Sequence, residues 1–511
     1  MDQQSQATLC TLRSATYANT IATVDNIEAI LANDEKVRVA GVDADGILRG
    51  KIMDKEKFLS SITSGFGMSS AIFAWDIHDV LFTTETKIAT SEDGFADFVA
   101  YPDLSSFRRL PTEDNIPFFL LSFAVGGKPV FACPRSMIRQ LCDKLAEAGC
   151  KALAGVELEF MNFQTPSEDG YRSPQGRQNL STFLEKNAPS ALRPLTGGMF
   201  GYSTSRPIAS KKYFHEIFDS SKKANCGLES WHTESGPGVY EAALKVSPID
   251  EMADKVSIFK LTTKSLGVEH GVTPCFLAKP SQGLPGNSGH IHVSLTDLDG
   301  KNVFALSGPP DQTAAWPDIA QLSDVGRYFL AGILVALPDI MPLLAPSINS
   351  YKRLVENYWA PVDVSWGLED RLASVRLVAP PVCKPAATRF EVRIPGADLH
   401  PHYALTAIVA AGWRGVMKKL DIPIPPAKIQ RKDTKPELLP DSLLEATHRF
   451  KAPDSLAREI LGDDFVDFFA ATREHELRVW REAVTDWQDL FLKLWDEADH
   501  HREFRRYIEV A

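Results

Sequence analysis

Acidic residues alternate with apolar ones in the stretch GVELEF, residues 155–160. Successive side chains of a β-strand point to opposite faces, so Glu157 and Glu159 would share one face and the three apolar residues the other. Two carboxylates at that spacing repel each other, and a cation held between them would offset this repulsion. The stretch is therefore a candidate cation site on one face of a strand.

Two further segments carry ligand-type side chains. HTESGPGVYE places Glu234 and Glu241 on either side of a Gly-Pro-Gly turn, and GNSGHIHVSL places His290 and His292 on one face of a predicted strand. Carboxylates combined with one or two imidazoles at strand ends suit hard divalent ions such as Mg²⁺ or Mn²⁺. Two such ions can hold a phosphoryl group during its transfer.

A third segment, RFEVRIPG, places Arg389, Glu391 and Arg393 on one face of another predicted strand. Arginines beside a ligand carboxylate fit an anionic substrate. Each pattern alone has a simpler explanation: the solvent face of a sheet, a satisfied core histidine or a cross-strand ladder of salt bridges. Their joint presence in one chain favours the functional interpretation.

The surrounding sequence supplies elements that could position these residues. Residues 134–149 have helical spacing, with Pro134 at the start and Gly149 at the end, so GVELEF follows a helix directly. Alternating runs flank Asp45-Gly46, which predicts a hairpin, and strand-like runs at 69–77 and before residue 125 complete a small mixed domain. Residues 166–197 are expected to be a surface loop, 420–442 a proline-rich loop and 441–509 helices.

Composition limits the class of protein. A chain of 511 residues is long for one core, and its net charge of −11 argues against nucleic acid as a partner. The seven cysteines form no CxxC or CxxH pair and are typical of reduced thiols, which favours a cytoplasmic location. The N-terminus lacks the pattern of a signal peptide, and the most apolar run, 404–413, is too short to span a membrane.

The order of the motifs resembles the class I glutamine synthetase family. The resemblance rests on GVELEF, HTESGPGVYE (with Val239 where Gln is usual), GNSGHIHVSL, NSYKRLVENYWAPV, SWGLEDRLASVRL and RFEVRIPGADLHPHYALTAIVAAGWRG, with YPDLSSFRRLP and LPDSLLEA in addition. It implies an α+β fold in which a β-grasp domain precedes a catalytic domain with an antiparallel active-site sheet and flanking helices. The expected boundaries are 1–33 for a helical extension, 34–125 for the β-grasp domain and 126–511 for the catalytic domain.

The resemblance also implies cofactors and roles: ATP and two or more Mg²⁺ or Mn²⁺ ions. Glu157, Glu234 and Glu241 would hold one ion, and Glu159, His290 and Glu391 the other. Arg353 and Gly286 would bind glutamate, and Arg393 would contact its γ-carboxyl group. The remaining residues expected on the nucleotide and phosphoryl side are Arg371, Arg376, Arg389, His292 and Ser294.

The chain departs from the family pattern on the amine side. The family's active-site flap reads PGxEAP, and its glutamate helps bind and deprotonate ammonium, whereas this chain has Trp359 at that position. An indole cannot accept that proton, but it can pack on an alkyl chain or face a cation. Tryptophan at this site also occurs in relatives that join glutamate to larger amines. Glu356 is a possible substitute acid, and Trp359 could instead pack the flap at a subunit contact.

Other departures also affect substrate recognition. The stretch 70–82 would complete the active site of a neighbouring subunit, with Asp76 as the expected ammonium-side acid and Asp79 as the alternative. His400 and His402 stand in the family's ANPYL motif, and Pro285 stands where the family often has Asn. These changes concern glutamate or amine recognition more than ATP.

The expected function is an ATP-dependent ligase that forms a γ-glutamyl amide from glutamate and an organic amine, for example a polyamine. The alternatives are a glutamine synthetase that uses ammonia, a catalytically inactive assembly protein of the same fold, and a phosphotransferase acting on a guanidino group. The resemblance implies a homo-oligomer, with a dodecamer of two stacked hexameric rings as the family default. No nucleic acid or membrane partner is expected.

Overall fold

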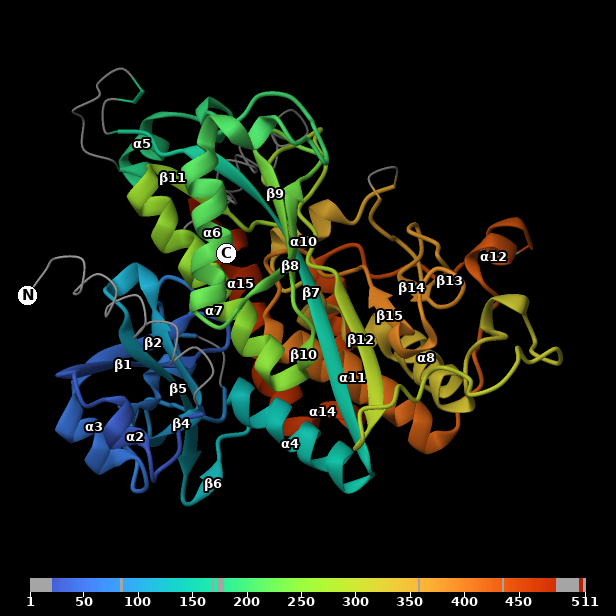
Figure 1. The fold of residues 1–511 in the computed structure, drawn as a ribbon, viewed down its shortest axis with the longest axis horizontal. Coiled ribbons are helices and arrows are strands. Elements are labelled where there is room, and N and C mark those ends of the chain that lie inside the picture. Colours follow the sequence, from blue (N-terminus) through green and yellow to red (C-terminus); the bar gives the residue numbers. More distant parts are fainter. Residues whose placement is uncertain are drawn as a thin grey trace, which may run out of the picture.

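The computed structural model describes residues 21–82, 86–167, 170–171, 179–356, 359–433, 436–483 and 505–508. These residues form two β-sheets and a set of helices that pack on them (Figure 1). Most of the predicted N-terminal helical extension lies outside the described residues, and its described part contains the short helix α2 (Ile27–Ile30). No described helix has the length and apolar character needed to cross a bilayer.

The smaller sheet lies in the N-terminal part of the chain, shown in blue in Figure 1. Its strand order is β2-β1-β5-β4-β3, with β6 paired to β5, and β1 runs parallel to β5 while the other pairs are antiparallel. The strands are β1 (Lys36–Val42), β2 (Leu48–Asp54), β3 (Phe66–Ser69), β4 (Asp97–Leu110), β5 (Ile116–Val125) and β6 (Lys128–Pro129).

The hairpin predicted at Asp45-Gly46 is confirmed, since β1 and β2 pair antiparallel on either side of it and Gly46 has a φ of 86°. The side chain of Asp54 then caps helix α3 (Lys55–Ser61) by accepting from two backbone N–H groups. The strand predicted over 69–77 is wrong. Residues Ser70–Phe73 form a 3₁₀ turn, because the Ser69 hydroxyl accepts from the Ala71 N–H and ends β3 there.

The larger sheet carries the motif segments. Its order is β13-β14-β15-β12-β7-β9-β8, with β10 and β11 also paired to the long strand β7, which crosses the centre of the molecule in Figure 1. The strands are β7 (Cys150–Gln164), β8 (Leu228–Thr233), β9 (Val239–Leu244), β10 (Ser247–Pro248), β11 (Val272–Cys275), β12 (Ile291–Asp297), β13 (Trp366–Leu368), β14 (Val375–Val378) and β15 (Arg389–Val392).

Helices cover this sheet and fill the C-terminal part of the chain. They are α4 (Pro134–Glu147), α5 (Leu180–Lys186), α6 (Lys211–Lys223), α7 (Ile249–His270), α8 (Asp324–Ala336), α9 (Met341–Leu344), α10 (Ile348–Arg353), α11 (Pro401–Lys418), α12 (Ala427–Asp433), α13 (Leu443–Lys451), α14 (Leu456–Leu461) and α15 (Asp463–Ala483). The further 3₁₀ turns are Pro111–Glu113, Pro189–Ala191, Arg206–Ser210, Pro317–Ile319, Leu337–Asp339 and Pro385–Ala387.

The helix predicted over 134–149 is confirmed by α4, and the helices predicted over 441–509 are confirmed as far as Ala483. Residues 484–504 of that prediction lie outside the described residues. The two predicted loops are partly helical. Helix α5 lies within 166–197, where Asn179 caps it, and α12 lies within 420–442.

One apolar core extends from the small sheet to the large one and positions β7. Its members include Phe119 and Phe123 of β5 and Leu158 and Phe160 of β7, all at most 1% exposed. Buried ion pairs join the same regions, because Arg135 of α4 contacts both Asp103 of β4 (2.6 Å) and Asp254 of α7 (2.8 Å). The strand that carries the paired glutamates is therefore fixed from its apolar face.

Candidate active site

The strand predicted at GVELEF is part of β7, and its burial alternates as the sequence pattern requires. Val156, Leu158 and Phe160 point into the core, while Glu157 and Glu159 lie on the more open face. The backbone N–H of Glu157 donates to the carbonyl of His290 (3.0 Å), and that of Glu159 donates to the carbonyl of Ser288 (2.9 Å). The histidine motif is thus joined directly to the acidic strand.

The first group of acids consists of Glu159, Glu234 and Glu241. Each contributes an oxygen, and these oxygens lie within 4.8 Å of one another. Glu159 and Glu241 are direct cross-strand partners on β7 and β9, and Glu234 reaches the group from the turn after β8. That turn needs its glycines, because Gly236 and Gly238 both have positive φ (142° and 70°).

Charge repulsion is strong in this first group. Burial, together with the neighbouring charges of Glu159, Glu157 and Glu234, raises the pKa of Glu241 to about 9. Burial also raises the pKa of Glu159, although its Oε2 accepts a hydrogen bond of 2.6 Å from the Ser288 N–H. Three converging carboxylates repel one another when they are ionised. A hard divalent cation bound among their oxygens would supply the positive charge that offsets this repulsion.

The second group of ligand-type side chains includes Glu157. One ligand atom each from Glu157, His292 and Glu391 falls within the same 4.8 Å limit. Strand register produces this meeting, because His292 of β12 faces Gly155 of β7 on one side and Glu391 of β15 on the other. His290 also belongs here, since its Nδ1 lies 3.4 Å from Glu157 Oε2 and 3.4 Å from Glu391 Oε1.

The two histidines have different partners. The Nε–H of Arg389 donates to Nδ1 of His292 at 3.1 Å, and a guanidinium can only donate. Nε2 of His292 faces Glu157 Oε1 at 3.2 Å but makes no hydrogen bond within the described part of the chain. His290 remains the residue predicted as the imidazole ligand.

The grouping of the side chains differs from the predicted division between two ions. The sequence prediction paired Glu157 with Glu234 and Glu241, and Glu159 with His290 and Glu391. The structure exchanges the two strand glutamates, because register places Glu159 opposite Glu241 and directs Glu157 toward the histidines. All five predicted acids fall into the two groups, the second group contains His292 in addition to the nearby predicted ligand His290, and the metal roles stay predictions.

Arginines surround the second group. Glu391, 1% exposed, contacts Arg393 Nη1 and lies 2.8 Å from Arg376 Nη1, its cross-strand neighbour on β14. Burial alone would raise the pKa of Glu391, but the charges of His290 and Arg393 outweigh it and hold that pKa at about 2. Arg376 also pairs with Glu369 in the loop after β13. The structure thus brings Arg376, Arg393 and Arg389 to one site.

The predicted glutamate-binding residues lie beside this group. Arg353, at the end of α10, donates to the carbonyl of Ile394 (2.9 Å) and approaches His290 Nε2 (3.4 Å). Burial lowers the pKa of Arg353 to about 10, and the charge of Glu159 opposes this shift. Gly286 packs on the same side chain, since a Cβ there would lie 2.8 Å from Arg353 Cγ and 2.5 Å from the Ala278 carbonyl oxygen.

The flap residue Trp359 lies next to Arg393. Its carbonyl accepts from Arg393 Nη2 at 3.5 Å, its φ is 58°, and 64% of the residue is exposed. Arg371 is exposed as well, and Ser294 is half-buried on β12. Glu356 is described, whereas the flap residues between it and Trp359 lie outside the described residues.

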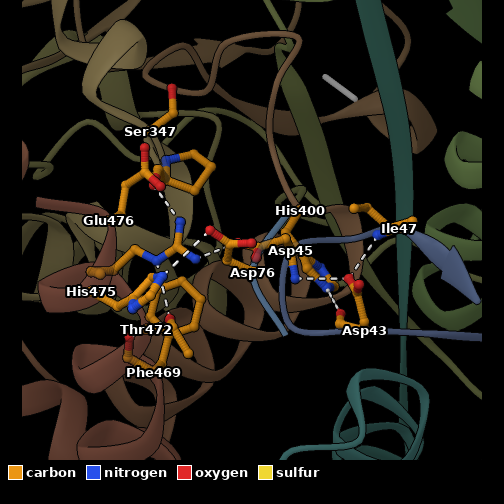
Figure 2. Close-up of polar contacts among 12 residues, drawn as sticks. Asp43, Asp45, Ile47, Asp76, Ser347, His400, Phe469, Thr472, His475 and Glu476 are labelled. Atoms are coloured by element: carbon orange, nitrogen blue, oxygen red, sulfur yellow. Dashed lines mark hydrogen bonds and ion pairs between the residues drawn. The ribbon is translucent and has the colours of Figure 1, made fainter. Parts of the chain in front are cut away.

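Asp76 lies in a different polar cluster, shown in Figure 2. Its Oδ1 accepts from the N–H groups of His78 and Val80, and its Oδ2 lies 3.1 Å from Arg506 Nη2 and 3.4 Å from His475 Nε2. With 3% exposure and both oxygens engaged, Asp76 is held by contacts within the described chain, and its ammonium-side role stays a prediction. The alternative, Asp79, has an exposed side chain that pairs with Arg49.

His400 and His402 are buried and have structural contacts. His400 Nε2 lies 3.0 Å from the carbonyl oxygen of Asp43 and its ring stacks on Tyr403, while His402 Nε2 lies 2.9 Å from Asp254 Oδ1. Figure 2 shows His400 against the β1–β2 turn. His400 thus joins the start of α11 to the β1–β2 turn, and His402 joins α11 to α7, so the contacts of both histidines are with the scaffold.

Sequence reasoning missed three residues that the structure places at the site. Tyr202 stacks on His232, with ring centroids 4.3 Å apart, and His232 Nε2 lies 3.9 Å from Glu241 Oε1. Glu369 pairs with Arg376. His232 was readable from the sequence, because it lies two residues before Glu234 on the strand. Tyr202 lies in an irregular segment whose path gave no periodic signal.

Comparison with known proteins agrees with this geometry. The model of the glutamine synthetase catalytic domain matches residues 131–490. A type-1 glutamine synthetase from Dictyostelium discoideum is 38% identical over 95% of this chain and 87% of its own length. A glutamate–isopropylamine ligase from a Pseudomonas species is 31% identical (89% and 94%), and a gamma-glutamylethanolamide synthetase from Streptomyces coelicolor is 30% identical (91% and 94%).

Solved structures share the fold. A GmaS/ADP complex superposes with a TM-score of 0.72 at 23% identity, covering 91% of this chain and 98% of that chain. A structure described as a glutamine synthase homolog gives the same TM-score at 21% identity, covering 92% and 98%. By sequence and by fold, the chain belongs to the glutamine synthetase catalytic domain family, whose members are ATP-dependent ligases that use Mg²⁺ or Mn²⁺.

Proposed function

We propose that this ligase uses ATP to phosphorylate the γ-carboxylate of glutamate and then transfers the acyl group to an organic amine. The first step forms a bond between a carboxylate oxygen and the γ-phosphorus and releases ADP. The amine nitrogen then forms the amide bond as phosphate leaves with the C–O electron pair. The amine must lose protons on the way, so an acceptor is needed beside it.

The two acidic groups would hold divalent ions, which would supply positive charge against the phosphates of ATP. Glu159, Glu234 and Glu241 suit one ion, and Glu157, Glu391 and His290 suit the other. The buried Arg353 and the half-buried Gly286 form a corner that fits the α-carboxylate of glutamate. The charge that develops on the transferring phosphoryl group would meet Arg376 and Arg393, which are already oriented by Glu391.

The main support for an organic amine as the acceptor comes from Trp359. Its exposed indole stands where the family pattern has the ammonium-binding glutamate, and its carbonyl contacts Arg393. An indole gives a small ammonium ion no acceptor, but it provides an apolar surface for the carbon chain of a larger amine. This substitution favours amines with an alkyl part.

A second aromatic surface lies at the first acidic group. Tyr202, 68% exposed, presents its ring beside the carboxylates, while its other face is covered by His232. The segment is held in place because the Tyr202 N–H donates to the Thr233 carbonyl at 2.7 Å. An aromatic face close to the negative charges of Glu241 and Glu234 suits the cationic head of an amine.

Ammonia is the second candidate, and one observation favours it: the Dictyostelium relative, named as a glutamine synthetase, is 38% identical over nearly the whole chain. The two relatives named for isopropylamine and ethanolamide are 31% and 30% identical, so identity alone does not decide the amine. An inactive assembly protein is disfavoured, because the repelling carboxylates of the first group have no structural use without a cation. Assembly into stacked rings and a cytoplasmic location stay predictions.

The test is ATP-dependent phosphate release measured with glutamate and a panel of acceptors: ammonia, hydroxylamine, methylamine, isopropylamine, ethanolamine, putrescine and spermidine. The expected result is a kcat/KM at least tenfold higher for one of the organic amines than for ammonia. A control without glutamate separates acyl transfer from direct phosphorylation of the amine or of a guanidino compound. The highest kcat/KM with ammonia would refute the organic-amine proposal.

A further inference from the structure

Glu369 combines a strained backbone with a position beside the site. It lies in the loop between β13 and β14 and has a φ of 53°, a conformation that non-glycine residues adopt at a cost. The loop is held there because the Glu369 N–H donates to the Leu377 carbonyl at 3.0 Å. A strained backbone at a glutamate next to a charged site indicates that its side chain has a role beyond packing.

The side chain of Glu369 holds Arg376 by one oxygen. Its Oε2 contacts Arg376 Nη2, whereas Glu369 Oε1 and Arg376 Nε are both buried and lack a hydrogen-bond partner within the described part of the chain. A guanidinium and a carboxylate can form two parallel hydrogen bonds, and here only one of the two is made. The contact therefore fixes the position of the guanidinium without using both of the hydrogen bonds that the two groups could make.

The other partner of Arg376 is already committed. Glu391 lies 2.8 Å from Arg376 Nη1 and also contacts Arg393 and His290. As a predicted metal ligand, Glu391 would share its oxygens with an ion and hold Arg376 less firmly. Glu369 belongs to neither acidic group, so it is the carboxylate that can keep its hold on Arg376 throughout the reaction.

We infer that Glu369 is a positioning residue for phosphoryl transfer, which fixes the guanidinium of Arg376 toward the transferring group. The inference rests on the role proposed above for Arg376. It differs from the role of a structural ion pair, because its loss would reduce the chemical step and leave ATP binding and the fold largely intact. This role of Glu369 is the same whichever amine the enzyme uses.

The test compares Glu369→Gln, Glu369→Asp and Arg376→Ala, and the double variant, each assayed with the acceptor that gives the wild type its highest rate. Glu369→Gln is expected to lower kcat at least tenfold and to change KM for ATP less than threefold. Glu369→Asp, which keeps the charge, is expected to recover part of the loss. Adding Glu369→Gln to Arg376→Ala is expected to lower kcat no further, because Glu369 acts through that arginine.

Asp370→Asn is the matched control, since Asp370 lies in the same loop but pairs with Arg431. It is expected to affect thermal stability without a tenfold loss of kcat. If Arg376→Ala lowers turnover and both Glu369 variants match the wild type, this inference is wrong while the proposed function stands. Independent, multiplicative losses in the double variant would also overturn it. Full turnover in Arg376→Ala would overturn this inference and the role proposed for Arg376, and would leave the proposed ligase reaction standing.

Discussion

Glu159 and Glu241 face each other directly across strands β7 and β9. Like charges in a cross-strand pair destabilise a sheet, and here the pair is partly buried with Glu234 close by. The arrangement therefore stores repulsion that a bound cation would relieve. This relationship connects the stability of the protein to the divalent ions that its family uses.

Removing one of these charges tests that connection. Glu241→Gln is expected to raise the melting temperature in EDTA, because it relieves the repulsion that raises the pKa of Glu241 to about 9. The same variant is expected to gain less from added Mg²⁺ or Mn²⁺ than the wild type does. Differential scanning fluorimetry with and without each ion measures both effects. An equal metal-dependent shift in the two proteins would remove Glu241 from the ligand set.

Arg376 and Arg371 differ in their surroundings and should differ in effect. Arg376 is held by Glu369 and Glu391, so Arg376→Ala is expected to lower kcat by about 10²–10³-fold, the range for a preorganised charge donor. Arg371 is exposed, and Arg371→Ala is expected to change KM for ATP more than kcat. Steady-state kinetics separate the two. A loss of melting temperature with unchanged kcat in Arg376→Ala would mark a structural ion pair.

A substitution at Gly286 tests the predicted glutamate-binding corner that it forms with Arg353. A methyl group at this position would lie 2.8 Å from Arg353 Cγ and 2.5 Å from a backbone oxygen, so Gly286→Ala must displace Arg353 or its own loop. The expected result is a KM for glutamate raised at least tenfold with a smaller change in KM for ATP. Gly283→Ala is a nearby control, because a Cβ there meets no atom within 4 Å, although its φ of 72° adds some backbone strain. Equal effects of the two variants would exclude a specific role for Gly286.

Asp76 allows a test by pH. Burial opposes its ionisation, but His475, the N–H groups of Val80 and His78, and Arg506 together lower its pKa below the ordinary value of 3.8. A lowered carboxylate pKa contributes stability that is present above pH 4 and is lost as the pH falls further. Asp76→Asn is therefore expected to destabilise the protein at pH 7, by about 3 kcal/mol for a broken buried pair.

The difference in melting temperature between the wild type and Asp76→Asn should shrink as the pH falls below 4. Asp79→Asn, at an exposed carboxylate, is the control and should have a smaller effect. A normal melting temperature in Asp76→Asn, combined with a large loss of kcat, would return Asp76 to the catalytic role first predicted for it.

The sequence was sufficient for the strands and for the set of acids, because alternation along GVELEF is a local property. It was not sufficient for the division of that set. Which glutamate joins which group of side chains depends on the register between β7, β9 and β12, and a shift of one residue reverses the faces. The contacts of Asp76 with His475 and Arg506 join positions about 400 residues apart, which no local pattern encodes.

Trp359 is the residue that we propose selects the amine. Trp359→Glu restores an acid at the flap and removes an apolar surface, so the ratio of kcat/KM for ammonia to that for an alkyl amine is expected to rise at least tenfold. Trp359→Phe keeps an aromatic surface and should preserve the wild-type ratio. The constants for ATP should change little in both variants. An unchanged ratio in Trp359→Glu would show that Trp359 does not select the amine.

The most direct measurement is a competition in a single tube. The wild-type enzyme is given glutamate, ATP and Mg²⁺ with ammonia and the panel of organic amines at equal concentrations of free base, and the products are identified by mass spectrometry. The expected result is that a γ-glutamyl amide of an organic amine accumulates ahead of glutamine and is absent when ATP is omitted. Glutamine as the main product would contradict the assignment of this protein as a ligase for organic amines.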